Sequence, residues 1–452
     1  MTIINRDCYP FLEAFGLYDP NSVLTWTGKA GHPDAIHYSN SYPNIAHKPF
    51  AFRDVYTVAD DEWLKPLDDS SNQYFYVEIY SESAFIIFPF IEWTGRWFEK
   101  IKNNEVQLFI QVNAHGTHEV IDSIYDNIII KYGIDPQNIT LASESADMAE
   151  HLEIMCGKLN LPKINLQWNV QFEHLQQIII RGPNWFGHRT NVLQHKHYEK
   201  KFLSFNGIFR PHRGALVMLL GAKNLLEKGF VSYNIKDIGY FRDRKIAGHV
   251  VSAGSAGEKA CDQTFESFHY NEEILNLLRD NREELIKIDR IDLESQESDQ
   301  YHPIYLTPNH CEFYENTYFS VVTETSFPHN RVNKYYAGVT DVGRILSEKI
   351  FKTISMRHPF IIVSNPYALK LLRDIGYKTF HPLINETYDK VKDPGVRMMM
   401  IINEIERLCE LEGEALTHFL TKAKEICDYN YSVMKNKKKF WYPLHYIEGT
   451  PI

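Results

Sequence analysis

The sequence predicts an α/β protein with two Rossmann-like domains, each built on a parallel sheet. Strand-like and helix-like segments alternate between residues 318 and 377 and again between residues 105 and 170, an order typical of parallel sheets. The chain has 452 residues, and a single hydrophobic core rarely supports a chain of that length. We therefore expect a first domain over residues 1–195, a second over residues 196–425 and a tail over residues 426–452.

The composition is that of a globular protein and argues against several classes. Hydrophobic residues make up 44% of the chain and charged residues 23%, both ordinary values. The net charge of −10 argues against a protein that coats nucleic acid nonspecifically. No apolar run reaches the roughly 18 residues of a membrane span, and no signal-peptide pattern opens the chain. The six cysteines lie far apart without C-x-x-C spacing, so we expect free thiols in a cytoplasmic protein.

The first domain divides into an aromatic-rich part and a regular part. Residues 1–104 are expected to form an irregular β cap with strands at 74–80 and 84–90 and a helix at 92–102. Residues 105–170 predict strands at 106–112, 138–141 and 163–168, separated by helices at 118–132 and 145–159. No G-x-G-x-x-G follows the first of these strands, so a dinucleotide site has no support.

The loop after the strand at 106–112 contains His115 and Glu119. Histidine and glutamate are side chains that can take a proton from a hydroxyl group, and both are therefore candidate bases. The alternative is that Glu119 only caps the following helix and that His115 is an ordinary loop residue.

The second domain opens with a strand at 200–206 that ends in Asn206. Arg210 and Arg213 follow at the start of an apolar helix at 215–226. The planar guanidinium group suits phosphate oxygens, so this helix start is a candidate diphosphate site. Residues 241–305 are interpreted as an insertion that contains an acidic amphipathic helix at 271–287.

Four further elements are predicted between residues 318 and 377: strands at 318–323 and 360–363, and helices at 347–356 and 367–375. Polar side chains follow or precede them, namely Thr323 and Glu324, then Ser347, Glu348 and Lys349, and finally Asn365. In open α/β sheets ligands bind beyond the carboxyl ends of the strands, so these groups are predicted to meet at one edge. The alternative for Glu348 is that of a helix-capping acid.

Helices are expected at 397–411 and 414–427, followed by a basic run at 435–439 beside aromatic residues. We expect this run to be solvated, because charge runs usually are. The alternative is contact with nucleic acid phosphates and bases. His188, His195 and His197 lack an evident fourth ligand, so no metal site is predicted.

Four short motifs in the second domain resemble the donor half of GT-B glycosyltransferases. They are T-E-T-S at 323–326, S-E-K-I-F at 347–351, R-H-P-F-I-I at 357–362 and S-N-P at 364–366. The resemblance is to α-1,3-fucosyltransferases and, more loosely, to exostosin-type enzymes. It covers about a third of the chain. The chain also resembles glycosyltransferase-like proteins of T4-type phages.

The resemblance implies a GT-B-like fold and a sugar transfer from a nucleotide-sugar donor to an acceptor hydroxyl. It implies that Glu348 binds the ribose hydroxyls, that Lys349, Arg210 and Arg213 bind the diphosphate, and that His115 or Glu119 is the acceptor's base. No D-x-D triplet occurs, so no metal and no other cofactor is expected. The acceptor is either a glycan or a hydroxymethylated base of phage DNA. A non-catalytic nucleotide- or glycan-binding protein on the same fold is the alternative function.

Overall fold

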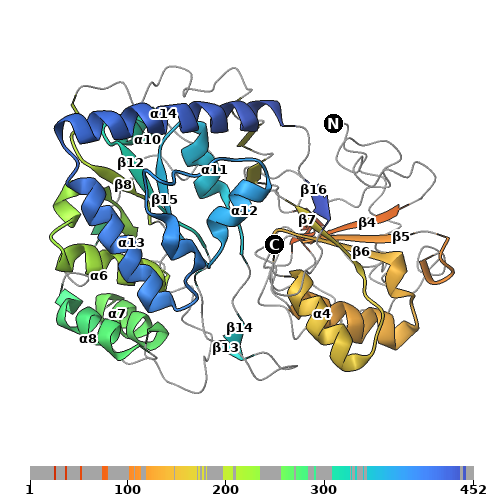
Figure 1. Ribbon diagram of the computed structural model, residues 1–452. Helices are drawn as coiled ribbons and strands as arrows, with labels where there is room; N and C mark the ends of the chain where they lie inside the picture. The colour runs from red at the N-terminus through yellow and green to blue at the C-terminus, as the bar shows by residue number, and fades with distance from the viewer. Residues whose placement is uncertain are drawn as a thin grey trace. The chain divides into compact units, whose positions relative to one another are not determined.

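The computed structural model divides into two compact units, Met1–Gln171 with Lys438–Ile452 and Phe172–Lys437 (Figure 1). The border at 171 lies earlier than the predicted domain border at 195, and the chain's end belongs to the first unit. The structure describes residues 25–26, 36–37, 51–52, 74–79, 101–105, 107–112, 119–146, 148–169, 172–173, 176–177, 180, 197–206, 210–234, 256–268, 271–283, 290–291, 308–325, 327, 331–332, 339–340, 344–437 and 441–443.

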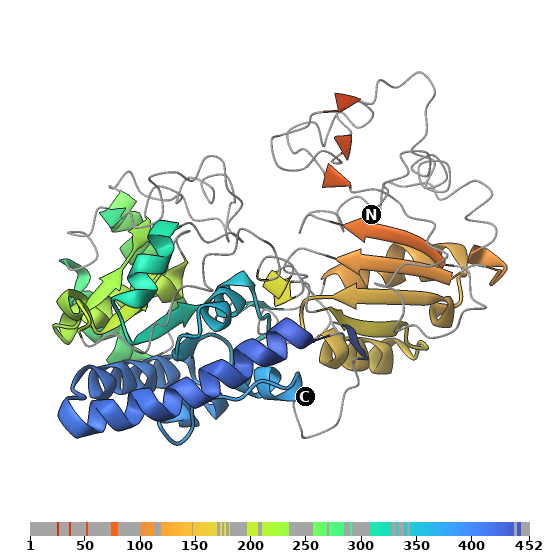
Figure 2. The same ribbon diagram turned by 90° about the horizontal axis from the view of Figure 1, so that it is seen from above.

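The first unit contains a sheet in the order β1-β2-β3-β4-β5-β6-β7-β16. Its four central strands are parallel and lie side by side (Figure 2): β4 (Tyr74–Ile79), β5 (Gln107–Val112), β6 (Ile139–Ser143) and β7 (Asn165–Asn169). Antiparallel strands extend both edges, with β1 (Thr25–Trp26), β2 (Ile36–His37) and β3 (Ala51–Phe52) beyond β4 and with β16 (Trp441–Pro443) beyond β7. The parallel part confirms the Rossmann-like prediction for residues 105–170.

The crossovers between these strands are helical. A helix begins as α3 (Glu119–Ile124) and continues as a π-helix over Tyr125–Ile130, and α4 (Met148–Leu159) follows β6. The apolar stripes of these helices are buried, as are Ile139 and Leu141 of the sheet. The Tyr125 hydroxyl fixes the turn before β7, donating to Pro162 O at 2.7 Å and accepting from Ile164 N at 3.0 Å.

The second unit is built on a parallel sheet in the order β15-β12-β8-β9. The strands are β15 (Phe360–Val363), β12 (Phe319–Thr323), β8 (Phe202–Ser204) and β9 (Gly229–Val231). Each residue of β12 and β15 is buried, as expected for a parallel sheet covered on both faces. A glycine is required at 229, because a Cβ there would lie 2.4 Å from the Phe202 ring.

Helices cover this sheet (Figure 1). α11 (Glu348–Ser355) packs on β12 and α14 (Gly413–Asn436), whereas α13 (Pro394–Cys409) packs on β15 and α6 (Pro211–Ala222). The remaining elements are α7 (Ala256–Ser267), α8 (Glu272–Asp280), α10 (Pro308–Glu315), α12 (Ala368–Asp374), the ribbon of β10 (Tyr233–Asn234) with β11 (Arg290–Ile291), and that of β13 (Arg331–Val332) with β14 (Val339–Thr340). None of the described helices combines the length and apolar character that crossing a bilayer requires.

Several predicted elements differ from the structure. The helix predicted at 215–226 begins earlier, at Pro211, and the last helix extends through Asn436 rather than ending at 427. Helices α7 and α10 were not predicted, because few apolar residues mark them and because α7 is stabilised by packing on α6. Lys437, expected to be solvated, lies in a buried ion pair. The predicted strand at 84–90 and most of the helix at 92–102 lie outside the described residues.

Candidate functional site

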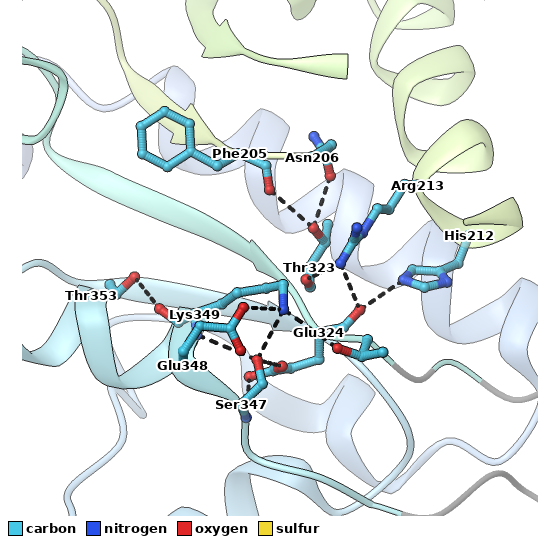
Figure 3. A network of polar contacts seen from close by, with 11 residues as sticks. Phe205, Asn206, His212, Arg213, Thr323, Glu324, Ser347, Glu348, Lys349 and Thr353 are labelled. Atoms are coloured by element: carbon cyan, nitrogen blue, oxygen red, sulfur yellow. Dashed lines mark hydrogen bonds and ion pairs between the residues drawn. The ribbon is translucent and has the colours of Figure 1, made fainter. Parts of the chain in front are cut away.

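The candidate site is assembled at the carboxyl edge of the sheet in the second unit, where β12 and β8 end (Figure 3). Thr323 is the last residue of β12 and Asn206 follows β8; both are buried. The Thr323 hydroxyl donates to Asn206 Oδ1 at 2.8 Å, and the Asn206 backbone N–H donates to Ser232 Oγ at 2.8 Å. Through these contacts Asn206 connects the ends of neighbouring strands of the sheet.

Glu324 connects the end of β12 to the start of α11. Its backbone N–H donates to Val363 O at 3.0 Å, which extends the ladder with β15 by one residue. Its fully buried carboxylate accepts from Ser347 N at 3.2 Å and from the Ser347 hydroxyl. Burial raises the pKa of Glu324, and the nearby Lys349 ammonium opposes that rise only in part. The predicted meeting of the segments around 324 and 347 is therefore present in the structure.

Ser347 is the N-cap of α11, a position that favours serine because its oxygen can accept from the first free N–H groups. Ser347 Oγ accepts from Lys349 N at 3.3 Å and from Lys349 Nζ at 3.2 Å. The same hydroxyl donates to Glu324. One buried serine thus links the helix start, the lysine ammonium and the buried carboxylate.

Lys349 and Glu348 are the partly exposed members of this cluster. Lys349 Nζ lies 2.7 Å from Glu348 Oε1, and the two side chains are 23% and 13% exposed. The ammonium group also contacts Thr325 Oγ1 at 3.4 Å. A ligand that reaches this edge would therefore meet a cation and a carboxylate together. The two side chains can bind a phosphate group and hydroxyl groups, respectively.

Arg213 and His212 lie on the first turn of α6 and point toward the backbone after β12 (Figure 3). Arg213 donates to Thr323 O at 3.1 Å and to Glu324 O at 3.4 Å, and His212 Nε2 lies 3.0 Å from Glu324 O. Both side chains are buried, and Phe327 stacks on the His212 ring. The guanidinium of Arg213 therefore holds the strand end in place.

The other predicted site residues are placed as follows. Arg210 is half-buried at the N-cap position of α6, and Asn365 is buried beyond the end of β15. Glu119 is the first residue of α3, while His115 lies outside the described residues. His212 was not predicted as a site residue. Its position next to Arg213, after the helix-starting Pro211, was the available signal.

Buried serine–histidine contacts elsewhere in this unit belong to the core. Ser320 Oγ lies 2.7 Å from His358 Nδ1, and His358 Nε2 lies 2.9 Å from Thr317 O. Ser320 is the second residue of β12, and Thr317 precedes the strand, so this pair lies at the amino end. It is remote along the strand from Glu324, and full burial lowers the pKa of His358 to about 4.

Among the described residues, no group of three or more His, Cys, Asp or Glu side chains could hold a metal ion. No protein-family model matches the chain, and no curated protein matches it. Among solved structures, the N-terminal domain of Candida albicans trehalose-6-phosphate phosphatase aligns with a TM-score of 0.34 and 8% identity, over 82% of this chain and 71% of that chain. A likeness this weak supports no argument about fold or function.

Proposed function

We propose that the chain is a glycosyltransferase and that its second unit binds the nucleotide-sugar donor. The observation that carries the proposal is the partly exposed Lys349–Glu348 pair at the start of α11, anchored from below by Ser347 and the buried Glu324. The pair lies at the carboxyl edge of a parallel sheet, which is where open α/β sheets bind their ligands. The resemblance of the same segments to GT-B donor domains supports this choice of ligand.

In this proposal Lys349 offsets negative charge on the diphosphate that leaves the sugar, and Glu348 accepts hydrogen bonds from the ribose hydroxyls. Arg210, at the start of α6, is the second candidate cation for the diphosphate. Arg213 has a different role from the one that the resemblance implies. It contacts the backbone carbonyls of Thr323 and Glu324, so it positions the loop rather than the donor.

The proposed reaction breaks the bond between the anomeric carbon and the diphosphate oxygen and forms a bond from that carbon to the acceptor oxygen. The acceptor hydroxyl loses its proton to a base, for which His115 and Glu119 of the first unit are the candidates. The bond electrons leave with the diphosphate, whose charge the cations stabilise. A GT-B-like pairing of two Rossmann-like domains and independence from metal ions are parts of the same proposal.

The acceptor hypotheses remain a glycan and a hydroxymethylated base of phage DNA. Salt dependence separates them, because contacts with DNA phosphates make affinity fall steeply as the salt concentration rises. A glycan acceptor would give a transfer rate that depends only weakly on salt.

The test is titration of the full-length protein with GDP, UDP, CDP and dTDP by calorimetry, followed by an assay for release of the nucleoside diphosphate from the matching nucleotide-sugar. We expect one nucleotide to bind and Lys349→Met to weaken it by about 10- to 150-fold, the loss of one charge-assisted hydrogen bond of about 1.5–3 kcal/mol. The matched control is Lys352→Met, on the same helix but outside the cluster.

Absence of binding by all four nucleotides would refute the donor-site proposal, as would an equal loss in both lysine variants. Binding without release of nucleoside diphosphate from any nucleotide-sugar, with glycan or DNA acceptors present, would favour the non-catalytic binding protein.

A further inference from the structure

The chain passes between the two units twice, after Gln171 and after Lys437. The residues on the second unit's side of these two passages are joined to one another. Glu173 Oε1 lies 2.7 Å from Lys437 Nζ, and the two side chains are 0% and 9% exposed. The two places where the chain enters and leaves the second unit therefore lie side by side.

Two hydrogen bonds and a ring contact surround this buried ion pair, while Glu173 Oε2 is buried without a hydrogen-bond partner among the described residues. The Tyr377 hydroxyl donates to the Glu173 carboxylate, Lys437 Nζ donates to Ile375 O at 2.8 Å, and the ammonium lies 4.9 Å from the centre of the Tyr377 ring. A buried ion pair persists when its charges are matched and hydrogen-bonded, and removing one partner leaves a costly unpaired charge. Substitution of either Glu173 or Lys437 alone is therefore expected to destabilise this part of the structure.

Backbone contacts reinforce the same connection. The Gln177 amide donates to Met434 O and to Lys437 O, both at 2.7 Å. These carbonyls lie in the last turn of α14 and just beyond it, where a helix lacks internal donors. Gln176 donates to Ser355 Oγ at 3.0 Å, at the end of α11. The segment that enters the second unit thus caps the helix by which the chain leaves it.

The first unit holds the same two passages by strand pairing. β16 pairs with β7 in antiparallel register, with Trp441 opposite Asn169. Three residues separate Asn169 from Glu173, and three separate Lys437 from Trp441. The two connections are therefore equally long.

We propose that Glu173 and Lys437 form a latch that makes the two connections act as one joint. In the first unit, the pairing of β7 with β16 joins the two connections at the unit's border. In the second unit, the Glu173–Lys437 ion pair joins them. Neither connection can then loosen alone at the border of the second unit. Opening the latch separates two buried charges, so both connections become mobile together.

The proposal is tested by hydrogen exchange, measured by mass spectrometry on the full-length protein, in peptides that cover residues 165–177 and 434–445. The variants are Glu173→Gln, Lys437→Gln and the double variant. Lys424→Gln is the matched control, because Lys424 pairs with Asp428 on the same helix at an exposed site. A peptide covering α6 reports on global unfolding.

We expect each single variant to speed exchange in both segments by about tenfold or more, because each leaves one buried charge unpaired. Exchange in both segments should be slower in the double variant than in either single variant, because its two amide side chains are neutral and can hydrogen-bond to each other. The control should match the native protein.

Faster exchange only in the segment that carries the substitution would overturn the latch. A double variant whose exchange is accelerated as much as in the two single variants combined would do the same. If a single variant does not fold, the double variant is compared with the native protein, and faster exchange in only one of the two segments would overturn the latch. Equal acceleration in the α6 peptide would show global destabilisation instead and would also refute the proposal.

Discussion

Substitution of Glu324 separates the effect of its buried charge from that of its hydrogen bonds. The carboxylate accepts from Ser347 N at 3.2 Å and from Ser347 Oγ. Glutamine keeps an acceptor for the backbone N–H and a partner for the hydroxyl, whereas alanine leaves both donors unpaired at a buried helix start. Each unpaired buried donor costs about 1–3 kcal/mol. Glu324→Ala should therefore lower the free energy of unfolding by about 2–4 kcal/mol at neutral pH, because loss of the buried charge offsets part of the cost.

Glu324→Gln should change the free energy of unfolding by less than about 1 kcal/mol at neutral pH or should increase it, since the amide has no charge to desolvate. The pH dependence of the free energy of unfolding tests the role of the buried Glu324 charge independently. Burial raises the pKa of Glu324 in the folded state, so the folded state binds the proton more tightly than the unfolded state. The contribution of Glu324 to stability is present below its unfolded pKa and is lost as the pH rises through its folded pKa.

The assay is urea denaturation followed by circular dichroism from about pH 4 to about pH 8, with the slope m checked for each variant. The difference between the native protein and Glu324→Gln isolates the titration of this one group. The reasoning is refuted if the glutamine variant is as unstable as the alanine variant, or if the difference between native and glutamine proteins does not change with pH.

Three further predictions concern the scaffold of the second unit. Gly229→Ala should lower the free energy of unfolding by about 1–3 kcal/mol through overpacking against the Phe202 ring, whereas unchanged thermal melting would contradict the close approach. His358 is buried with its pKa lowered to about 4 from the usual 6.5, so its contribution to stability is present above about pH 6.5 and is lost as the pH falls toward 4. That loss amounts to about 3 kcal/mol; a His358→Gln variant with the same acid-side slope in urea titrations would argue against it. Arg397→Met should lower the free energy of unfolding by about 3–5 kcal/mol, because the buried guanidinium donates to Ser364 O at 3.1 Å and to the carbonyls that precede α13; retention of native stability in chemical denaturation would disprove that role.

The sequence predicted the strands and helices of the sheets well where local pattern and burial agree. Residues 360–363 are uniformly apolar and form β15 with the predicted bounds, and the stripe of Ile350, Phe351 and Ile354 marks α11. The helix α10 was missed because its residues show no clear apolar stripe. In the structure its Phe313 ring packs against Phe205, which follows β8, and against Phe230 of β9. Propensity is a weak guide where tertiary contacts decide the structure.

The candidate site was predictable to the extent that topology fixes it. The carboxyl ends of neighbouring parallel strands must share an edge, and Glu324 and Ser347 do meet there. Side-chain direction was not predictable from the sequence. Arg213 follows β8 in a position typical of phosphate-binding residues, but it is directed to the carbonyls of Thr323 and Glu324. Nothing in the local sequence distinguishes these two orientations.

The buried contacts of Arg213 have a consequence for the proposed donor site. Arg213 and His212 fix the backbone of Glu324, and Glu324 in turn fixes Ser347 and the start of α11. The Lys349 ammonium is therefore positioned through a series of buried hydrogen bonds that begins on α6. Preorganised charge stabilises a developing anion without a cost of reorganisation at the moment of reaction. Arg213→Met should consequently weaken nucleotide binding through a displaced Lys349, and it should also lower stability, whereas Lys349→Met should weaken binding alone. Unfolding and binding measured on the same two variants distinguish a positioning residue from one that contacts the ligand.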